Sequence, residues 1–218
     1  MLFSFSGWAS RGAFLISRGL FSNVKVALLR MSPDPEELIA ASARICYASE
    51  PKTKDADVKL LRNLRDWGHM STFEHASATF LIEGVSRACT HQLVRHRIAS
   101  YSQQSQRYVN AEGFEYVTPP TVSADPKTLK RFDAAVEGAR KAYKELVKLG
   151  VPKEDARFLL PNACATKIIV TMNFRELRHF VRLRTAKGAQ WEISALAREM
   201  LRILKEKAPN AFDDITPE

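Results

Sequence analysis

Apolar positions alternate in parts of the first half of the chain and recur at helical spacing in most of the second half. Residues 23–30 (NVKVALLR) alternate well enough to predict a strand, and residues 77–83 (SATFLIE) have the composition of a buried strand. Residues 114–120 (FEYVTPP) predict a third, short strand that ends at two prolines. The predicted strands are few and do not alternate regularly with helices.

Helices account for most of the remaining pattern. Asp34 and Pro35 occupy the N-cap and first helical positions of a predicted helix, and two more helices are expected at 56–67 and 86–96. The second half predicts four helices, at 125–150, 151–161, 172–188 and 189–207. The last of them gathers apolar side chains on one face, namely Ile193, Leu196, Ala197, Met200 and Leu204. The expected fold class is α+β, a small mixed or antiparallel sheet flanked by helices in a single domain.

Length and composition agree with one globular domain. The chain has 218 residues, of which 45% are hydrophobic. Residues 1–22 contain no acid, and arginines interrupt their apolar positions, so we interpret them as a poorly ordered leader and place the folded domain at 23–218. No stretch approaches the ~20 apolar residues that span a bilayer. The three cysteines are widely spaced and match neither a disulfide framework nor a zinc site, which favours a cytoplasmic location.

The net charge of +9 suggests phosphate-bearing partners, and one segment concentrates the donors that would bind them. Residues 95–108 (RHRIASYSQQSQRY) combine arginines with hydroxyls and amides, and no acid occurs between Gly84 and Asn110. Guanidinium groups bind phosphate oxygens in pairs, and hydroxyls and amides add further donors. A solvated loop would usually mix charges of both signs, so we interpret this segment as anion-binding.

Two other clusters carry polar side chains. Residues 68–76 (GHMSTFEHA) contain His69, Glu74 and His75, whose spacing is not that of a helical zinc site and which have no obvious third ligand. In the predicted helix near 173–184, four basic residues share one face, while Arg184 falls on the other side; the four are Arg175, Arg178, His179 and Arg182. Framed by Asn173, Phe174 and Trp191, this face favours a pocket for a flat, charged ligand.

Several common motifs are missing from the sequence. It contains no GxGxxG and no GxxxxGK[ST], so side chains and helix ends would have to hold any nucleotide. There is no GxSxG nucleophile motif, and Cys89 and His91 would diverge on a helix. The residues therefore point to phosphate binding without an obvious covalent nucleophile.

Four ordered blocks resemble the flavin-dependent thymidylate synthase family. RHRIASYSQQSQR is similar to its RHR-x7-S-x-R signature, and GHMSTFEH to its GH-x-[ST]-x-FEH segment. ARFLLP resembles the family's AR-x-x-LP segment, and NFRELRHFVRLR followed by AQWEI resembles its C-terminal block. Order and spacing agree from roughly Asn23 to Phe212.

The resemblance implies an enzyme that methylates dUMP to dTMP. Methylenetetrahydrofolate would supply the carbon, reduced FAD the hydride, and NADPH would recharge the flavin. It also implies a homotetramer whose active sites are completed by different subunits, with no nucleic-acid or membrane partner and no metal.

The resemblance further assigns residues to the site. Flavin-binding positions are Ser71, Arg95, His96, Arg97, Asn173, Phe174, Arg175 and His179. Positions that bind dUMP are Gln92, Leu93, Val94, Arg95, Gln103, Gln104, Ser105, Gln106, Arg107, Arg157 and Arg184. Arg184 is the catalytic position, because a fixed cation beside the uracil stabilises negative charge on the ring and makes C5 nucleophilic. Ser105 lacks an adjacent base, so we interpret it as a donor.

Two alternatives explain part of the sequence. A basic nucleic-acid-binding module would account for the charge and the interspersed aromatic residues, though not for the four ordered blocks. A metal-dependent phosphoesterase would use His69, Glu74, His75 and His91, which form no convincing ligand set.

Overall fold

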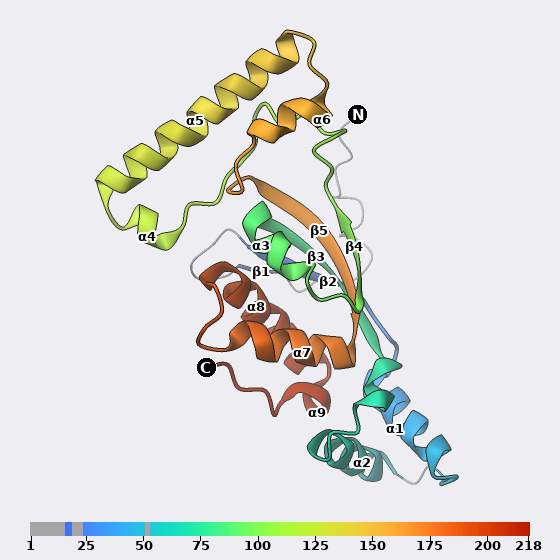
Figure 1. The fold of residues 1–218 in the computed structure, drawn as a ribbon. Helices are drawn as coiled ribbons and strands as arrows, with labels where there is room; N and C mark the ends of the chain where they lie inside the picture. Colours follow the sequence, from blue (N-terminus) through green and yellow to red (C-terminus); the bar gives the residue numbers. More distant parts are fainter. Residues whose placement is uncertain (1–15, 19–23, 51–52) are drawn as a thin grey trace.

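The computed structural model describes residues 16–18, 24–50 and 53–218, and its centre is an antiparallel sheet (Figure 1). The sheet has five strands in the order β1-β2-β3-β5-β4. The strands are β1 (Ile16–Arg18), β2 (Lys25–Met31), β3 (Ser77–Ser86), β4 (Ala99–Gln103) and β5 (Ala165–Asn173). All of their pairings are antiparallel. The expected α+β class is confirmed. The expected leader, 1–22, lies outside the described residues except for β1.

The central strands bury one face of the sheet. On β3, alternate residues such as Phe80 and Ile82 are fully buried, and on β5 the same is true of Ile168 and Val170. Helices cover this face: α3 (Arg87–Leu93), α7 (Phe174–Thr185) and α8 (Trp191–Lys207) (Figure 1). Phe180 and Leu196 from these helices are buried in the same core.

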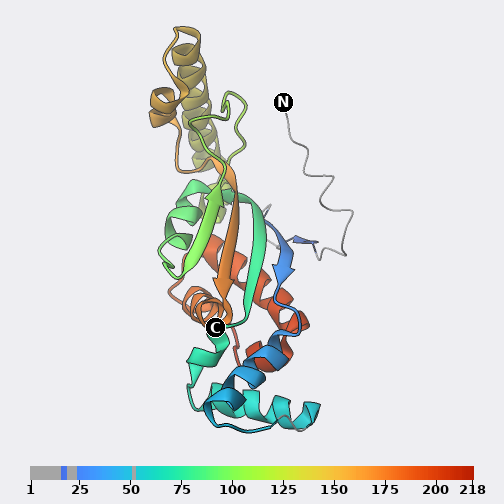
Figure 2. The ribbon, with the colours of Figure 1, turned by 90° about the vertical axis from the view of Figure 1, so that its right-hand side faces the viewer.

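The remaining helices form two groups at opposite ends of the sheet (Figures 1 and 2). At one end lie α1 (Pro35–Cys46), α2 (Lys54–Asp66), η3 (Met70–Glu74) and α9 (Pro209–Phe212). At the other end the chain between β4 and β5 forms a projecting arm, which contains α4 (Pro120–Ser123), α5 (Pro126–Lys148), α6 (Lys153–Ala156) and η4 (Arg157–Leu159). In the described ranges no helix is both long and apolar enough to cross a membrane.

Local signals set several helix ends as predicted. Asp125 caps α5 by accepting a hydrogen bond from the backbone of Lys127, and Gly150 follows the helix with a φ of 89°, which suits glycine. The first helix also begins at Pro35. Asp34, however, does not cap it: its backbone is left-handed and its side chain makes no capping hydrogen bond.

Other predicted elements were wrong. Residues 114–120 form no strand, and only Tyr116 makes an isolated bridge, to Cys164. The helix predicted at 86–96 ends at Leu93, so the chain turns before it enters β4. The helix predicted from Met172 begins at Phe174, because residues 165–173 belong to β5, a central strand that the pattern did not reveal.

Candidate active site

The anion-binding segment and α7 come together because of the sheet topology. β4 pairs with β5, and β5 passes into α7 without a connecting loop, so α7 folds back along the turn that precedes β4. Asn173 fixes this junction, since its side chain accepts a hydrogen bond from the backbone of Glu176 at 2.8 Å. Residues that lie 80 to 92 positions apart in the sequence thus become neighbours.

Arg184 is held between two groups of the preceding segment. Its Nε donates to Nε2 of His96 at 3.1 Å, and its Nη2 donates to the carbonyl oxygen of Gln92 at 3.2 Å. The side chain is half-buried. A guanidinium group has five N–H donors, so those on its outer edge remain for a ligand.

His96 is buried, with 4% of its surface exposed. Its Nδ1 lies 3.0 Å from Oε1 of Glu176, and its ring packs against that of Phe180 in a T-shaped arrangement at a centroid distance of 5.0 Å. Burial lowers the pKa of His96; the hydrogen bond to Glu176 opposes this effect, and the charge of Arg184 lowers the pKa further. Nε2 of His96 accepts a hydrogen bond from Arg184, which can only donate, so the geometry requires the neutral form of the ring.

The turn that carries His96 is anchored by Tyr101 on β4. The hydroxyl of Tyr101 lies 2.8 Å from the carbonyl oxygens of both Leu93 and His96. A tyrosine hydroxyl has one proton, so it donates to one carbonyl at a time or is shared between them. Burial raises the pKa of Tyr101, which keeps this donor protonated.

One possible metal-ligand atom from each of His96, Glu176 and His179 lies within 4.8 Å of the other two, a spacing that could suit a metal ion. However, both ring nitrogens of His96 are already used in hydrogen bonds, and the adjacent cation Arg184 would repel a metal. The arrangement is better explained as a hydrogen-bond chain. In the described part of the molecule, the four residues of the phosphoesterase alternative do not gather into a group with metal-ligand spacing.

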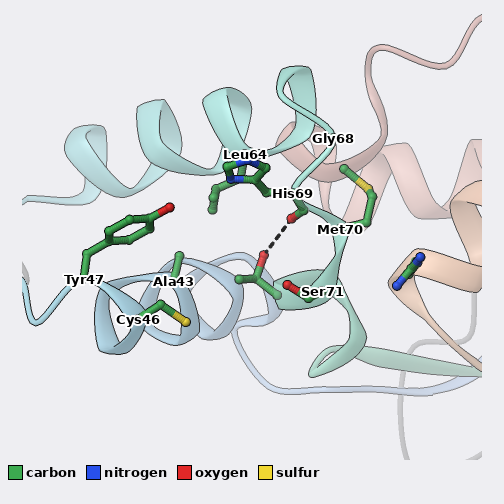
Figure 3. A pocket seen from close by; sticks show the side chains of 10 residues that line it. Ala43, Cys46, Tyr47, Leu64, Gly68, His69, Met70 and Ser71 are labelled. Atoms are coloured by element: carbon green, nitrogen blue, oxygen red, sulfur yellow. Dashed lines mark hydrogen bonds between the residues drawn. The ribbon is translucent and has the colours of Figure 1, made fainter.

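A cavity of about 360 Å³ opens between α1, α2 and η3 (Figure 3). Two residues predicted to bind flavin, Ser71 and Arg175, line it, and Arg175 also pairs with Glu74 at 2.5 Å. The other lining residues are Ala43, Cys46, Tyr47, Leu64, Gly68, His69, Met70 and Thr72. The sequence reading missed the side of the cavity that α1 supplies, because Cys46 and Tyr47 belong to no motif that we identified.

The predicted nucleotide-binding positions 103–107 and Arg157 lie where β4 meets the arm. Gln103 donates to Thr90 on α3 at 3.0 Å, and the hydroxyl of Ser105 accepts from the backbone of Arg107 at 3.2 Å. The acid that is missing from this segment of the sequence comes from α6, since Glu154 pairs with Arg107 at 2.8 Å. Both partners are about half exposed, so this ion pair is weak and a phosphate could replace the carboxylate.

Arg87, which was not predicted, belongs to the same region. It donates to the carbonyl oxygen of Gln104 at 3.3 Å. Burial lowers the pKa of Arg87, and the neighbouring charge of Arg157 lowers it further. Two arginines brought together by the fold form a local positive field. Arg87 stands in the same acid-free segment as the arginines of the signature, and that acid-free context was the available signal.

Two predicted site residues have side chains that face the core. Leu93 is fully buried, and the ring of Phe174 is also buried and packs against Phe212 at a centroid distance of 5.0 Å. At these positions only the backbone is left for a ligand. Among the predicted flavin-binding positions, five residues are exposed: Ser71, Arg95, Arg97, Arg175 and His179.

The predicted basic face of α7 is divided between different partners. Arg178 is 1% exposed and makes a two-pronged ion pair with Asp214, at 2.6 and 2.8 Å. Arg182 reaches the same carboxylate at 2.7 Å. The expectation that Arg178 helps to form a ligand pocket was therefore wrong, because its buried side chain connects α7 to the segment after α9. Arg182, which is about half exposed, shares the same carboxylate.

Two cysteines are unsuited to nucleophilic chemistry. Burial raises the pKa of Cys89, and it raises the pKa of Cys164 to about 11. Both groups stay as thiols at neutral pH.

Comparisons with known proteins show the family. Residues 27–210 match the family model described as thymidylate synthase complementing protein. A flavin-dependent thymidylate synthase of Geobacter sulfurreducens is 55% identical over 203 residues, covering 89% of this chain and 88% of the relative. The enzyme of the same name from Clostridium tetani is 46% identical over 218 residues, covering 89% of this chain and 88% of the relative. The one from Pyrococcus abyssi is 45% identical over 195 residues, covering 84% of this chain and 80% of the relative. The chain belongs to the flavin-dependent thymidylate synthase family.

Proposed function

We propose that this chain catalyses the reductive methylation of dUMP to dTMP, with methylenetetrahydrofolate as carbon donor and FAD, recharged by NADPH, as hydride carrier. Family membership supports the reaction class. The observation that carries the proposal is the placement of Arg184, whose guanidinium is fixed on one side by His96 and the carbonyl oxygen of Gln92.

The role of Arg184 follows from where charge develops. C5 of the uracil attacks the methylene carbon more readily when negative charge on the uracil ring is stabilised. A cation that is already fixed beside the ring stabilises this negative charge without reorganising during the reaction. Since its inner donors are occupied, Arg184 presents its outer edge to the pyrimidine.

The phosphate of dUMP would bind at the root of the arm. Arg87, Arg107 and Arg157 supply charge there, and the hydroxyl of Ser105 lies in the same segment. Arg107 would exchange its exposed partner Glu154 for the phosphate. This arrangement needs no glycine-rich phosphate loop.

The residues around the cavity between α1 and η3 fit part of a flavin dinucleotide. Ser71 offers a hydroxyl and Arg175 a guanidinium. The volume of the cavity, about 360 Å³, is near the lower limit for ligand pockets. Arg95, Arg97 and His179, which are exposed, would supply further contacts to the flavin. When bound, FAD supplies the hydride-transfer chemistry of the reaction.

Shared active sites in a homotetramer agree with the geometry of α7. Arg175 and Arg184 stand nine residues apart on this helix, and at about 100° per residue their side chains start on opposite sides. A flavin beside Arg175 and a uracil beside Arg184 would then belong to sites completed by different protomers. We propose that this assembly works in the cytoplasm, without nucleic-acid or membrane partners.

The test is release of tritium from 5-tritiated dUMP by the purified protein with FAD, methylenetetrahydrofolate and NADPH. We expect release that depends on every component, a yellow protein with a flavin absorption band, and the mass of four chains in solution. A colourless protein that takes up no FAD and releases no tritium would contradict the proposal. Tight binding to nucleic acid by such a protein would favour the alternative.

A further inference from the structure

Glu176 is a buried carboxylate in the first turn of α7, with 6% of its surface exposed. A buried carboxylate is costly unless hydrogen bonds satisfy it. Its Oε1 lies 3.0 Å from Nδ1 of His96, and its backbone N–H is capped by Asn173. The positive end of the α7 helix dipole also favours a negative charge at this position.

The direction of the hydrogen bonds from Arg184 to Glu176 is fixed by chemistry. The guanidinium of Arg184 can only donate, so Nε2 of His96 must accept its bond. A neutral imidazole that accepts at Nε2 carries its proton on Nδ1, and Glu176 is the acceptor for that proton. The three side chains therefore form one hydrogen-bond chain. The bond from Arg184 to His96 requires the ring proton to be on Nδ1, and Glu176 accepts that proton.

We propose that Glu176 is a positioning residue, which holds the guanidinium of Arg184 in place through His96. This inference rests on the proposed function, because it concerns the residue assigned there to the uracil. It also gives the His96 ring a role other than contact with flavin, since both of its nitrogens face protein groups.

The geometry of Arg184 explains why this bond matters. The bond to His96 and the bond to the Gln92 carbonyl together fix the plane of the guanidinium group. With the Gln92 bond alone, the group can rotate about a single contact. The outer N–H groups would then lose the orientation that a planar ring needs, although the cation would still be present.

The surroundings leave Glu176 free for this task. The buried Arg178 on the same helix is matched by Asp214, and the ring of His179 lies 5.5 Å from that of His96. The groups whose charges act on the imidazole ring of His96, namely Glu176, His179 and Arg184, all belong to α7. Tyr101 on β4 contacts only the backbone carbonyl of His96, through its hydroxyl. The helix α7 thus contributes both ends of the hydrogen-bond chain, Glu176 and Arg184.

The first test compares two substitutions at position 176. Glu176→Leu removes the acceptor, and we expect kcat to fall by about tenfold or more while bound flavin per subunit is retained. Glu176→Gln keeps a carbonyl that can accept the Nδ1 proton, and we expect kcat within about threefold of the parent. Loss of flavin in Glu176→Leu, or equal kcat losses in both variants, would overturn the proposal.

A matched control addresses simple destabilisation. Glu192 on α8 is an equally buried carboxylate that accepts from the backbone and hydroxyl of Ser86, and no hydrogen bond links it to Arg184. We expect Glu192→Leu to lower Tm at least as much as Glu176→Leu while keeping a higher kcat. If Glu176→Leu fails to fold, Glu176→Ala, which also removes the acceptor, takes its place in this comparison and in the cycle below.

The decisive measurement is a double-mutant cycle between Glu176→Leu and Arg184→Ala, read out as kcat and as dUMP affinity. If Glu176 acts through Arg184, the effect of its substitution disappears in the Arg184→Ala background. Additive losses would overturn the inference while leaving the proposed function intact. Unchanged turnover and dUMP affinity in Arg184→Ala alone would instead contradict the proposed role of Arg184, and with it the inference.

Discussion

At the scale of single residues, the properties of the site come from partners that are distant in sequence. His96 and Gln92 precede Arg184 by 88 and 92 residues, yet both accept its hydrogen bonds. The sequence motifs identified Arg184 and His96 as members of a site, through the resemblance. They could not reveal that the two side chains touch, because this contact depends on how β5 and α7 are placed.

The assignment of roles to the arginines predicts different losses. Arg184→Ala should lower turnover by about 10²–10³-fold, as the loss of a fixed donor to developing charge does elsewhere, while flavin stays bound. Arg95→Ala and Arg97→Ala should weaken flavin binding instead. Bound flavin is measured by visible absorbance and turnover by tritium release. Loss of flavin in the Arg184 variant alone would show that the roles are reversed.

The contact between Arg87 and Gln104 predicts a role in phosphate binding. Arg87→Ala should raise KM for dUMP about tenfold, since hydrogen bonds to charged groups contribute roughly 1.5–3 kcal/mol. Deoxyuridine, which lacks the phosphate, provides the matched control: its much weaker turnover should change little. An equal loss for both compounds would indicate that Arg87 supports the fold rather than the phosphate.

At the scale of elements, the pattern predicted the long helices well and the sheet incompletely. β4 was interpreted as a polar segment because its outward residues Ser100 and Ser102 are exposed and little apolar periodicity remains. β5 lies in the centre of the sheet, but its apolar run from Ile168 to Val170 is too short to distinguish from the start of a helix. Family membership, predicted from the four blocks, is confirmed; the roles of individual site residues stay predictions.

The junction between β5 and α7 predicts a measurable cap. Asn173→Ala should lower the free energy of unfolding by about 1 kcal/mol, because the backbone N–H of Glu176 loses its partner. Asn173→Asp keeps the acceptor and should remain close to the parent in urea unfolding. If alanine has no effect on stability but reduces bound flavin, Asn173 serves the cofactor rather than the helix.

At the scale of the whole molecule, Asp214 connects α7, the helix that carries the site, to α2 and to the C-terminal segment. Arg178 and Arg182 from α7 bind it, and Arg65 from α2 lies 3.7 Å away. Burial by itself raises the pKa of Asp214, but hydrogen bonding to Arg178 and the three positive charges outweigh it, so the pKa is lower in the folded protein. This carboxylate joins the end of the chain to the helix that carries the site.

The lowered pKa predicts how acid acts on stability. The contribution of Asp214 should be complete above the pKa of an unfolded aspartate, about 3.9, and should be lost as the pH falls toward the folded value. Thermal unfolding across this range should show a fall in Tm that Asp214→Asn reduces, from a lower starting stability. A variant with the same acid dependence as the parent would assign the effect to other carboxylates.

The pairing of Arg178 with Asp214 also has a consequence for how this sequence can change over generations. Replacing either residue alone leaves a buried charge without its counter-ion or removes the tie between α7 and the end of the chain. Descendants can therefore exchange the pair for an apolar one only by changing both positions almost together. Whether a substitution at position 178 is tolerated therefore depends on the residue at position 214, although 35 residues lie between them.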